Sequence, residues 1–156
     1  MKPILIICLG NPLMRDEGIG IHLASELSTQ LAGRPGVEVL DLGTGGLTVI
    51  HAIKGRKKIV FIDCAIMGEA QGVMRRFTPE EVRSKKVKRR YSLHEGDLLD
   101  NLELSRNLCE CPEDIVIFGI EPKEIAPGEG LSEELQGNIK YYIETILKEL
   151  EIPKMK

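Results

Sequence analysis

The sequence predicts an α/β fold with a mostly parallel sheet, and three observations lead to this prediction. Apolar segments alternate with amphipathic ones in the order strand, helix, strand, helix, strand, which is typical of right-handed parallel crossovers. The apolar segments are apolar throughout, as expected of strands that are covered on both faces. One later segment follows the third strand too closely for a crossover helix, which predicts an antiparallel edge strand.

The first strand and helix have the clearest patterns. The strand is predicted at Ile4–Leu9, where the residues ILIICL form a continuous apolar run. In the following helix, one core-facing stripe consists of apolar residues spaced four apart: Ile19, Leu23, Leu27 and Leu31.

The middle of the chain continues the alternation. Strands are predicted at Val37–Leu42 and Lys58–Cys64, with a short helix between them in LTVIHAI. The edge strand is predicted at Gly72–Thr78. A helix then begins, because Thr78 and Glu81 have the spacing of a capping box and a proline occupies the first turn.

The last strand is predicted at Ile115–Pro122, and a final helix from about Ser132. One broad apolar face of that helix consists of Leu135, Ile139, Ile143, Ile146, Leu147 and Leu150. The sequence has neither internal repeats nor a dividing linker, so residues 1–156 are predicted to form a single domain.

Composition narrows the function classes. The chain has 156 residues, 42% hydrophobic and 29% charged, so an ordered domain is expected. Its net charge of −3 gives no general attraction to nucleic acid, and no apolar run approaches the ~20 residues of a membrane span. We expect a cytoplasmic protein without a nucleic acid partner or membrane insertion. A monomer is the expected oligomeric state.

The four cysteines fit a reducing compartment. Cys8 and Cys64 fall in apolar strands, where a free thiol behaves as a small buried hydrophobe. Cys109 and Cys111 form a C-x-C pair after a helix, and such a pair is a weak zinc pattern because closed zinc sites take four ligands. A plain loop is the preferred interpretation of the pair.

Five acidic residues are predicted to lie on one rim of the sheet. Ligands of open α/β sheets bind beyond the carboxyl ends of the strands. Asp16 and Glu17 follow the first strand, Asp41 and Asp63 end the next two, and Glu121 ends the last. Each acid also has a simpler explanation, since acids after parallel strands often cap the next helix. Asp63, which ends a wholly apolar strand, is the hardest to explain in that way.

A histidine completes a candidate metal site. Ser92 and Glu95 have capping-box spacing, which places His94 in the first turn of a helix. The helix dipole disfavours imidazolium there, and neutral imidazole is the form that binds metal. One histidine with two carboxylates suits a borderline divalent ion such as nickel or zinc. The alternative is an exposed loop histidine.

Two other features allow a functional and a structural interpretation. The basic run Arg83–Arg90 is either a solvated face or a docking site. Gly45 and Gly46 either permit a tight helix entry or let a peptide backbone approach closely. A dinucleotide site is disfavoured, because the turn after the first strand lacks G-x-G-x-x-G and its acids would repel a pyrophosphate.

Taken together, the sequence resembles the hydrogenase maturation endopeptidases, which process the large subunit of nickel–iron hydrogenases. The resemblance covers nearly the whole chain and is carried by five motifs: GNPLMRDEGIG, LDLGTGG, IVFIDCAIMG, SLHEGDLLD and FGIEP. It implies a three-layer α/β/α architecture, with about five strands in a twisted sheet and helices on both faces.

The resemblance also implies a function. Glu17, Asp63 and His94 match the family's metal-contacting, catalytic residues, and the metal is nickel carried by the substrate. The implied reaction removes a C-terminal extension from the precursor of a hydrogenase large subunit after nickel insertion. Either the metal or a carboxylate assists the hydrolysis, and the peptide's path is expected to be lined by Asp41, Gly45, Gly46 and Glu121. The competing interpretation is a non-catalytic α/β module for metal delivery or docking.

Overall fold

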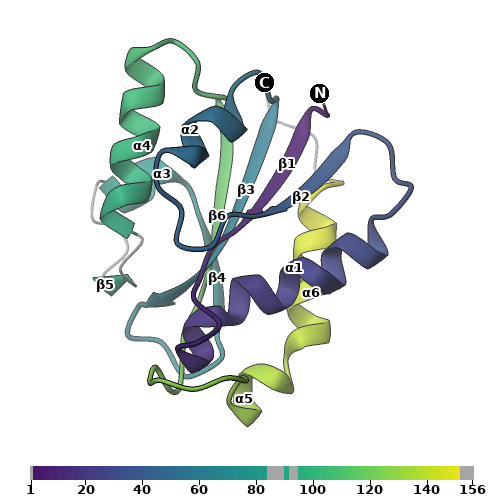
Figure 1. Cartoon of the computed structure of the whole chain (residues 1–156), viewed down its shortest axis with the longest axis vertical. Helices are drawn as coiled ribbons and strands as arrows, with labels where there is room; N and C mark the ends of the chain where they lie inside the picture. Colours follow the sequence, from purple (N-terminus) through teal and green to yellow (C-terminus); the bar gives the residue numbers. More distant parts are fainter. Residues whose placement is uncertain (1, 84–89, 92–94, 152–156) are drawn as a thin grey trace.

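The computed structural model describes residues 2–83, 90–91 and 95–151 and contains a twisted sheet between two layers of helices (Figure 1). The strands are β1 (Ile4–Cys8), β2 (Val37–Asp41), β3 (Lys58–Ile66), β4 (Met74–Phe77), β5 (Arg90–Tyr91) and β6 (Asp114–Ile120). The helices are the 3-10 helix η1 (Arg15–Gly18), α1 (Ile19–Gln30), α2 (Thr48–Ile53), α3 (Pro79–Arg83), α4 (Glu95–Asn107), α5 (Glu133–Gln136) and α6 (Ile139–Glu149).

The main sheet has the strand order β2-β1-β3-β6-β4. The first four strands in this order are parallel, and β4 pairs antiparallel with β6 at the edge, which confirms the predicted fold class. The third strand is longer than predicted. It runs past Cys64 to Ile66 because its end pairs antiparallel with the two-residue strand β5. Asp63 therefore lies inside β3, opposite Gly119 of β6, and not at the strand's end.

Alternate residues of the central strands supply two apolar cores, as the pleat of a sheet requires. Ile6 and Cys8 of β1 pack in the core under α1 and α6, whereas Leu5 and Ile7 pack in the core under α2 and α4. The two helix pairs lie on opposite sides of the sheet in Figure 1. This double burial explains why the strand segments are apolar throughout.

The helix starts confirm one predicted cap and correct one prediction. Thr78 and Glu81 form the expected reciprocal capping box. The Ser132 side chain caps α5 at the predicted start of the final helix. The predicted single C-terminal helix is two helices, because the chain breaks at Gly137 and Asn138. The Asn138 side-chain amide donates to the carbonyl of Glu134 at 3.0 Å, a local bond that competes with helix continuation.

No helix in the described ranges combines the length and apolar character needed to cross a membrane.

A buried ionic cluster fixes α6 to the amino ends of the strands. Glu149, near the end of α6, is only 2% exposed and accepts from Lys58 at 2.8 Å. The Arg76 guanidinium of β4 also donates to Glu149, with Nη2 at 3.1 Å from Oε2. Lys58 contacts Asp114 of β6 at 3.5 Å as well. The cluster thus joins three strands to the C-terminal helix.

At the other end of the sheet, Asp16 joins two segments that are distant in sequence. Its Oδ2 accepts from the amides of Lys123 and Glu124, both at 2.9 Å, and from the Ser132 hydroxyl at 2.8 Å. Its Oδ1 accepts from the Ser132 amide at 2.7 Å. The side chain is fully buried. Asp16 therefore fixes the β6–α5 loop against η1.

Burial raises the pKa of Asp16, but the hydrogen bonds from Ser132, Glu124 and Lys123 outweigh burial and hold the pKa below its usual value. Because the folded-state pKa is lowered, the charged form stabilises the fold above the unfolded-state pKa of about 3.9. This stabilisation is lost as the pH falls through the folded-state pKa.

We expect Glu149→Ala to lower the free energy of unfolding by about 3 kcal/mol, because removal of one partner leaves the buried Lys58 poorly compensated. Urea unfolding measures the effect. Glu144→Ala, which removes an exposed acid of the same helix, should change it by less than about 0.5 kcal/mol. Equal effects of the two substitutions would show that the cluster adds nothing to stability.

We expect Asp16→Asn to lower the free energy of unfolding by about 2–4 kcal/mol at pH 7. The NH2 group of the asparagine would replace one carboxylate oxygen and would face N–H donors instead of accepting from them. The difference from the wild type should shrink as the pH falls below about 4. Urea unfolding between pH 3 and 8 measures it, with Glu129→Gln, an exposed acid of the same loop, as control. A difference that is constant over this range would contradict the charge-dependent role.

Candidate active site at the carboxyl edge of the sheet

Buried acids gather at the carboxyl ends of the parallel strands, at the lower end of Figure 1. Glu17 comes from η1, Asp63 from β3, and Glu121 directly follows β6. These three residues are 5%, 5% and 6% exposed. The parallel pairing of β1, β3 and β6 brings them to one edge, which confirms the shared rim predicted from the sequence.

The thiol of Cys64 shows how closely the acids converge. Burial raises the pKa of this thiol well above its usual range, and the negative charges of Asp63, Glu17, Asp16 and Glu121 raise it further, in that order. Four carboxylates from three separate segments thus act on one sulfur atom. A thiol with a raised pKa is a poor nucleophile at neutral pH. Cys64 is therefore unsuited to nucleophilic catalysis, as the sequence predicted.

Two glycines allow the segment with Glu17 to lie directly on the strand ends. A Cβ atom on Gly20 would overlap the carbonyl oxygen of Leu9 and lie 2.9 Å from that of Ile62. Gly10 has φ +147° and its Cβ would overlap the carbonyl oxygen of Glu17. Larger side chains at either position would push η1 away from β1 and β3, and the glutamate with it.

Asp63 has one oxygen held by its own strand. Its Oδ1 accepts the amide N–H of Cys64 at 2.8 Å, which orients the carboxylate at the edge. Asp63 is on the central strand β3, between the strands that precede Glu17 and Glu121. It is therefore the middle acid of the group.

Glu121 supports a loop. Its Oε1 accepts the amides of Met67 at 2.7 Å and Glu69 at 3.1 Å, and its backbone bonds with Gly72 and Val73. These bonds hold the β3–β4 loop against the end of β6. Contact between Glu121 and a peptide substrate stays a prediction, since at least one carboxylate oxygen serves this loop.

The other predicted peptide-lining residues lie at the end of β2 and in the loop that follows it. Asp41 is exposed, and its Oδ1 accepts the Gly43 amide at 2.9 Å. Gly45 and Gly46 have φ +87° and +95°, which favours glycine. The Gly46 carbonyl accepts from the Asn101 side chain of α4 at 2.8 Å. The loop is thereby attached to a helix, and its role toward a peptide stays a prediction.

The charge of Asp41 also acts on a buried cysteine. Burial, and to a lesser degree Asp41, raise the pKa of Cys8 to about 12. Both strand cysteines are thus buried neutral thiols, as predicted. Cys109 is exposed and Cys111 is partly buried, both beyond the end of α4.

Some predicted features lie outside the described residues. His94 is one of them, and so are residues 84–89 of the basic run. Within residues 2–83, 90–91 and 95–151, no group of three His, Cys, Asp or Glu side chains is arranged to hold a metal ion. The described residues thus contribute two members of the predicted trio, Glu17 and Asp63.

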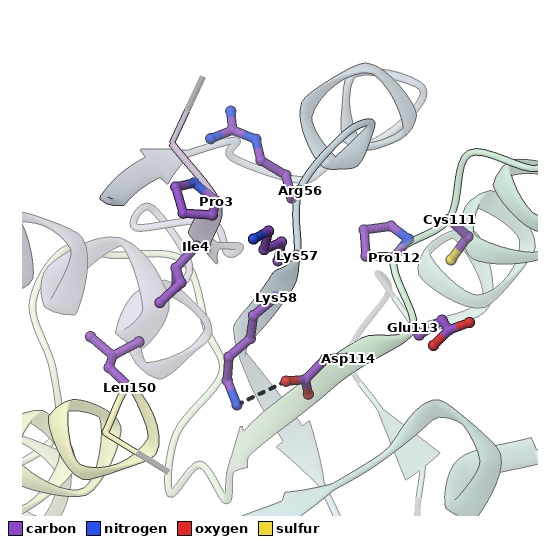
Figure 2. Close-up of a pocket in the computed structure, with 10 residues that line it drawn as sticks. All are labelled: Pro3, Ile4, Arg56, Lys57, Lys58, Cys111, Pro112, Glu113, Asp114 and Leu150. Atoms are coloured by element: carbon purple, nitrogen blue, oxygen red, sulfur yellow. Dashed lines mark hydrogen bonds and ion pairs between the residues drawn. The ribbon is translucent and has the colours of Figure 1, made fainter. Parts of the chain in front are cut away.

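A pocket of about 700 Å³ opens at the opposite end of the sheet (Figure 2). Two of its charged side chains pair with acids: Arg56 bonds to Glu38 at 2.8 Å, and Lys58 contacts Asp114 at 3.5 Å, as Figure 2 shows. The pocket lies at the amino ends of β3 and β6, away from the edge where α/β folds bind ligands. We therefore assign the candidate site to the buried acids.

Sequence reasoning missed the residues that position these acids. Ser132 was predicted only as a helix start, yet its amide and hydroxyl both bind Asp16. Met67 and Glu69, whose amides bind Glu121, had no predicted role. Backbone amides give no signal in sequence, so only the Ser132 hydroxyl offered a hint.

Comparison with known proteins gives one consistent family. Residues 21–149 match the family model described as HycI, hydrogenase maturation protease. The chain is 28% identical to the hydrogenase expression/formation protein HupD of Thiocapsa roseopersicina, over 94% of this chain and 67% of that protein. It is also 28% identical to the hydrogenase 2 maturation protease of Escherichia coli strain K12, over 94% and 90% of the two chains.

Solved structures agree with the sequence matches. The hydrogenase maturating endopeptidase HybD from E. coli superposes with a TM-score of 0.83 at 27% identity, over 97% of this chain and 93% of that one. The NiFe hydrogenase maturation protease HybD from Thermococcus kodakarensis gives a TM-score of 0.78 at 29% identity, over 95% and 98%. The family match spans most of the chain, so this protein belongs to the hydrogenase maturation proteases, a family of peptidases.

Proposed function

We propose that this peptidase removes a C-terminal extension from the precursor of a nickel–iron hydrogenase large subunit after nickel has been inserted. The observation that carries the proposal is the pair of buried carboxylates, Glu17 and Asp63, at the carboxyl edge of the sheet. The family supplies the protease class, and the names of its relatives supply the hydrogenase as target. The proposed working form is a cytoplasmic monomer.

The acidic site suits a substrate that carries a cation. Burying like charges together is unfavourable, and a divalent ion on the substrate would offset the repulsion among these acids. Glu17 and Asp63 would contact the ion, and His94, from the family resemblance, would add a nitrogen ligand. The nickel in this scheme arrives with the precursor. A nickel-free precursor would bind without the favourable contact between the ion and the acids. The contacts of Glu17, Asp63 and His94 with the ion would therefore distinguish nickel-loaded from nickel-free precursor.

The chemistry proposed for the protein's own side chains is that of carboxylates. One of Glu17 and Asp63 would accept a proton from the water that adds to the scissile carbonyl carbon. The same carboxyl group would return this proton to the leaving amine as the C–N bond breaks, and the substrate's metal would position the carbonyl. Because Cys64 is held as a thiol by burial and by the surrounding negative charge, no covalent cysteine intermediate is proposed. Asp16 lies beside Glu17 in sequence and holds the loop that follows β6.

We expect the protein to shorten nickel-loaded precursor and to leave nickel-free precursor intact, because only the loaded form carries the cation that the acids bind. Intact-mass spectrometry of both precursors after incubation measures the loss of the C-terminal extension. Cleavage of both forms at equal rates would contradict recognition of nickel. Binding of the loaded form without any cleavage would instead support a docking role.

We expect Glu17→Gln and Asp63→Asn each to lower kcat/KM for the loaded precursor by roughly a hundredfold or more, because each removes a charge from the ion site or the proton acceptor. His94→Ala should act similarly. Steady-state cleavage measures the effect, and Glu26→Gln, an exposed acid on α1, is the control.

Glu17→Gln and Asp63→Asn should unfold within about 1 kcal/mol of the wild type, since each relieves repulsion among the buried acids. This separates them from Asp16→Asn, for which a stability loss is expected. Loss of activity that only accompanies a large loss of stability would argue that these acids are structural.

A further inference from the structure

The carboxyl edge carries an unusual share of the exposed apolar side chains. Among the described residues, seven large hydrophobic side chains are notably exposed, and four of them lie at this edge. They are Leu13, Leu47, Ile66 and Ile125, which are 60%, 67%, 42% and 37% exposed. Single exposed hydrophobic residues are ordinary, but their concentration at one end of a molecule marks an interaction surface. We refer to these four residues as the apolar rim.

Each of the four parallel strands contributes one residue of the apolar rim. Leu47 lies after β2, Leu13 after β1, and Ile125 after β6, while Ile66 is the last residue of β3. Leu47, Leu13 and Ile66 thus belong to the neighbouring strands β2, β1 and β3. The loop of Ile125 turns back toward the segment after β1, where the Glu124 carbonyl accepts the Asp16 amide at 3.0 Å. Glu17 follows β1 and Asp63 lies on β3, so the acids and the apolar rim belong to the same edge of the sheet.

The dimensions of this edge match a short extended peptide. Four neighbouring strands span about 14 Å at about 4.8 Å per spacing. An extended chain rises about 3.3 Å per residue, so roughly five residues laid across the strand ends would reach from one side to the other. Such a segment would pass over the acids at its middle.

The segments that carry the apolar rim are held in place by backbone bonds. The Leu13 carbonyl accepts the Gly128 amide at 2.8 Å, which joins the loops of Leu13 and Ile125. Leu47 is the N-cap of α2, and its carbonyl accepts the Ile50 amide at 3.1 Å. Ile66 pairs with Arg90 of β5. A surface that is formed before binding loses little conformational freedom when a ligand docks.

We propose that the apolar rim binds an extended segment of the hydrogenase precursor, laid across the carboxyl edge so that aliphatic side chains of the segment contact the rim and the cleaved bond lies over the acids. This inference rests on the proposed function and adds the chemistry of the segment. The buried acids disfavour a peptide with acidic residues near its middle, whereas a cation there is favoured. The apolar rim favours aliphatic side chains in the segment.

Three exposed hydrophobic residues away from this edge supply controls. Leu104 lies on α4 and Leu108 just after it, while Tyr141 lies on α6. Leu104 and Leu108 are 43% and 54% exposed, which is comparable to the apolar rim. They lie toward the end of α4 that leads to the start of β6, at the opposite edge of the sheet.

The test compares the double variant Leu13→Gln/Leu47→Gln with the double variant Leu104→Gln/Leu108→Gln. Binding of full-length nickel-loaded precursor to immobilised protein and steady-state cleavage are both measured. We expect the first variant to weaken binding and raise KM by roughly tenfold or more, with kcat within about twofold of the wild type. The control variant should match the wild type in both measurements.

The outcomes separate this inference from the proposed function. If the wild type cleaves the precursor and both variants behave like it, the apolar rim does not bind substrate although the function stands. If the wild type binds without cleaving and only the first variant loses binding, the rim is supported and the peptidase proposal fails.

The apolar rim could instead bind a second copy of this chain, and sedimentation velocity of the protein alone tests this alternative. A dimer that dissociates only in the first variant would overturn the proposal. If the wild type and the Leu13→Gln/Leu47→Gln variant sediment alike, the proposal is supported. Thermal unfolding of both variants within about 2 °C of the wild type confirms that exposed positions were changed without loss of the fold.

Discussion

The candidate site depends on one buried carboxylate that has a structural role. Asp16 accepts four hydrogen bonds, all from the loop between β6 and α5, although more than 100 residues separate the partners along the chain. The bonds fix η1 against that loop, and η1 carries Glu17. Backbone bonds join the same two segments, among them that from the Asp16 amide to the Glu124 carbonyl at 3.0 Å. The Asp16 carboxylate adds four side-chain bonds to this junction, and in this way helps to set the geometry of the site.

The adjacent acids Asp16 and Glu17 show how neighbouring carboxylates acquire different roles. Hydrogen bonds stabilise the charged form of Asp16 and keep its pKa low, so its charge is part of the fold. Glu17 is directed to the acidic group around Cys64, where the local negative charge raises the pKa of the thiol. Backbone amides thus satisfy one acid, and the other belongs to a site whose charge favours a cation. The sequence of these two adjacent acids alone does not show that one has a structural role and the other belongs to the site.

Much of the fold could be predicted from the sequence, because the relevant signals are local. Continuous apolar strands, the capping pair Thr78 and Glu81, and the antiparallel edge strand follow from periodicity and chain length between segments, and the structure has all of them. The shared rim of the acids also followed, since parallel strands end at one edge. The break at Gly137 was missed because the apolar face of the final helix continues across it.

The contacts that set the site were beyond sequence reasoning for a physical reason. Asp16 with Ser132, and Glu121 with the amides of Met67 and Glu69, are bonds to loop backbone whose direction depends on the whole fold. The same holds for the apolar rim. Its residues belong to separate segments of the chain, and only the parallel strand arrangement brings those segments to one edge of the sheet. Parallel topology is thus the common cause. It delivers one segment from each strand to the same edge, so buried acids and exposed apolar side chains scattered over more than 100 residues lie at one end of the sheet.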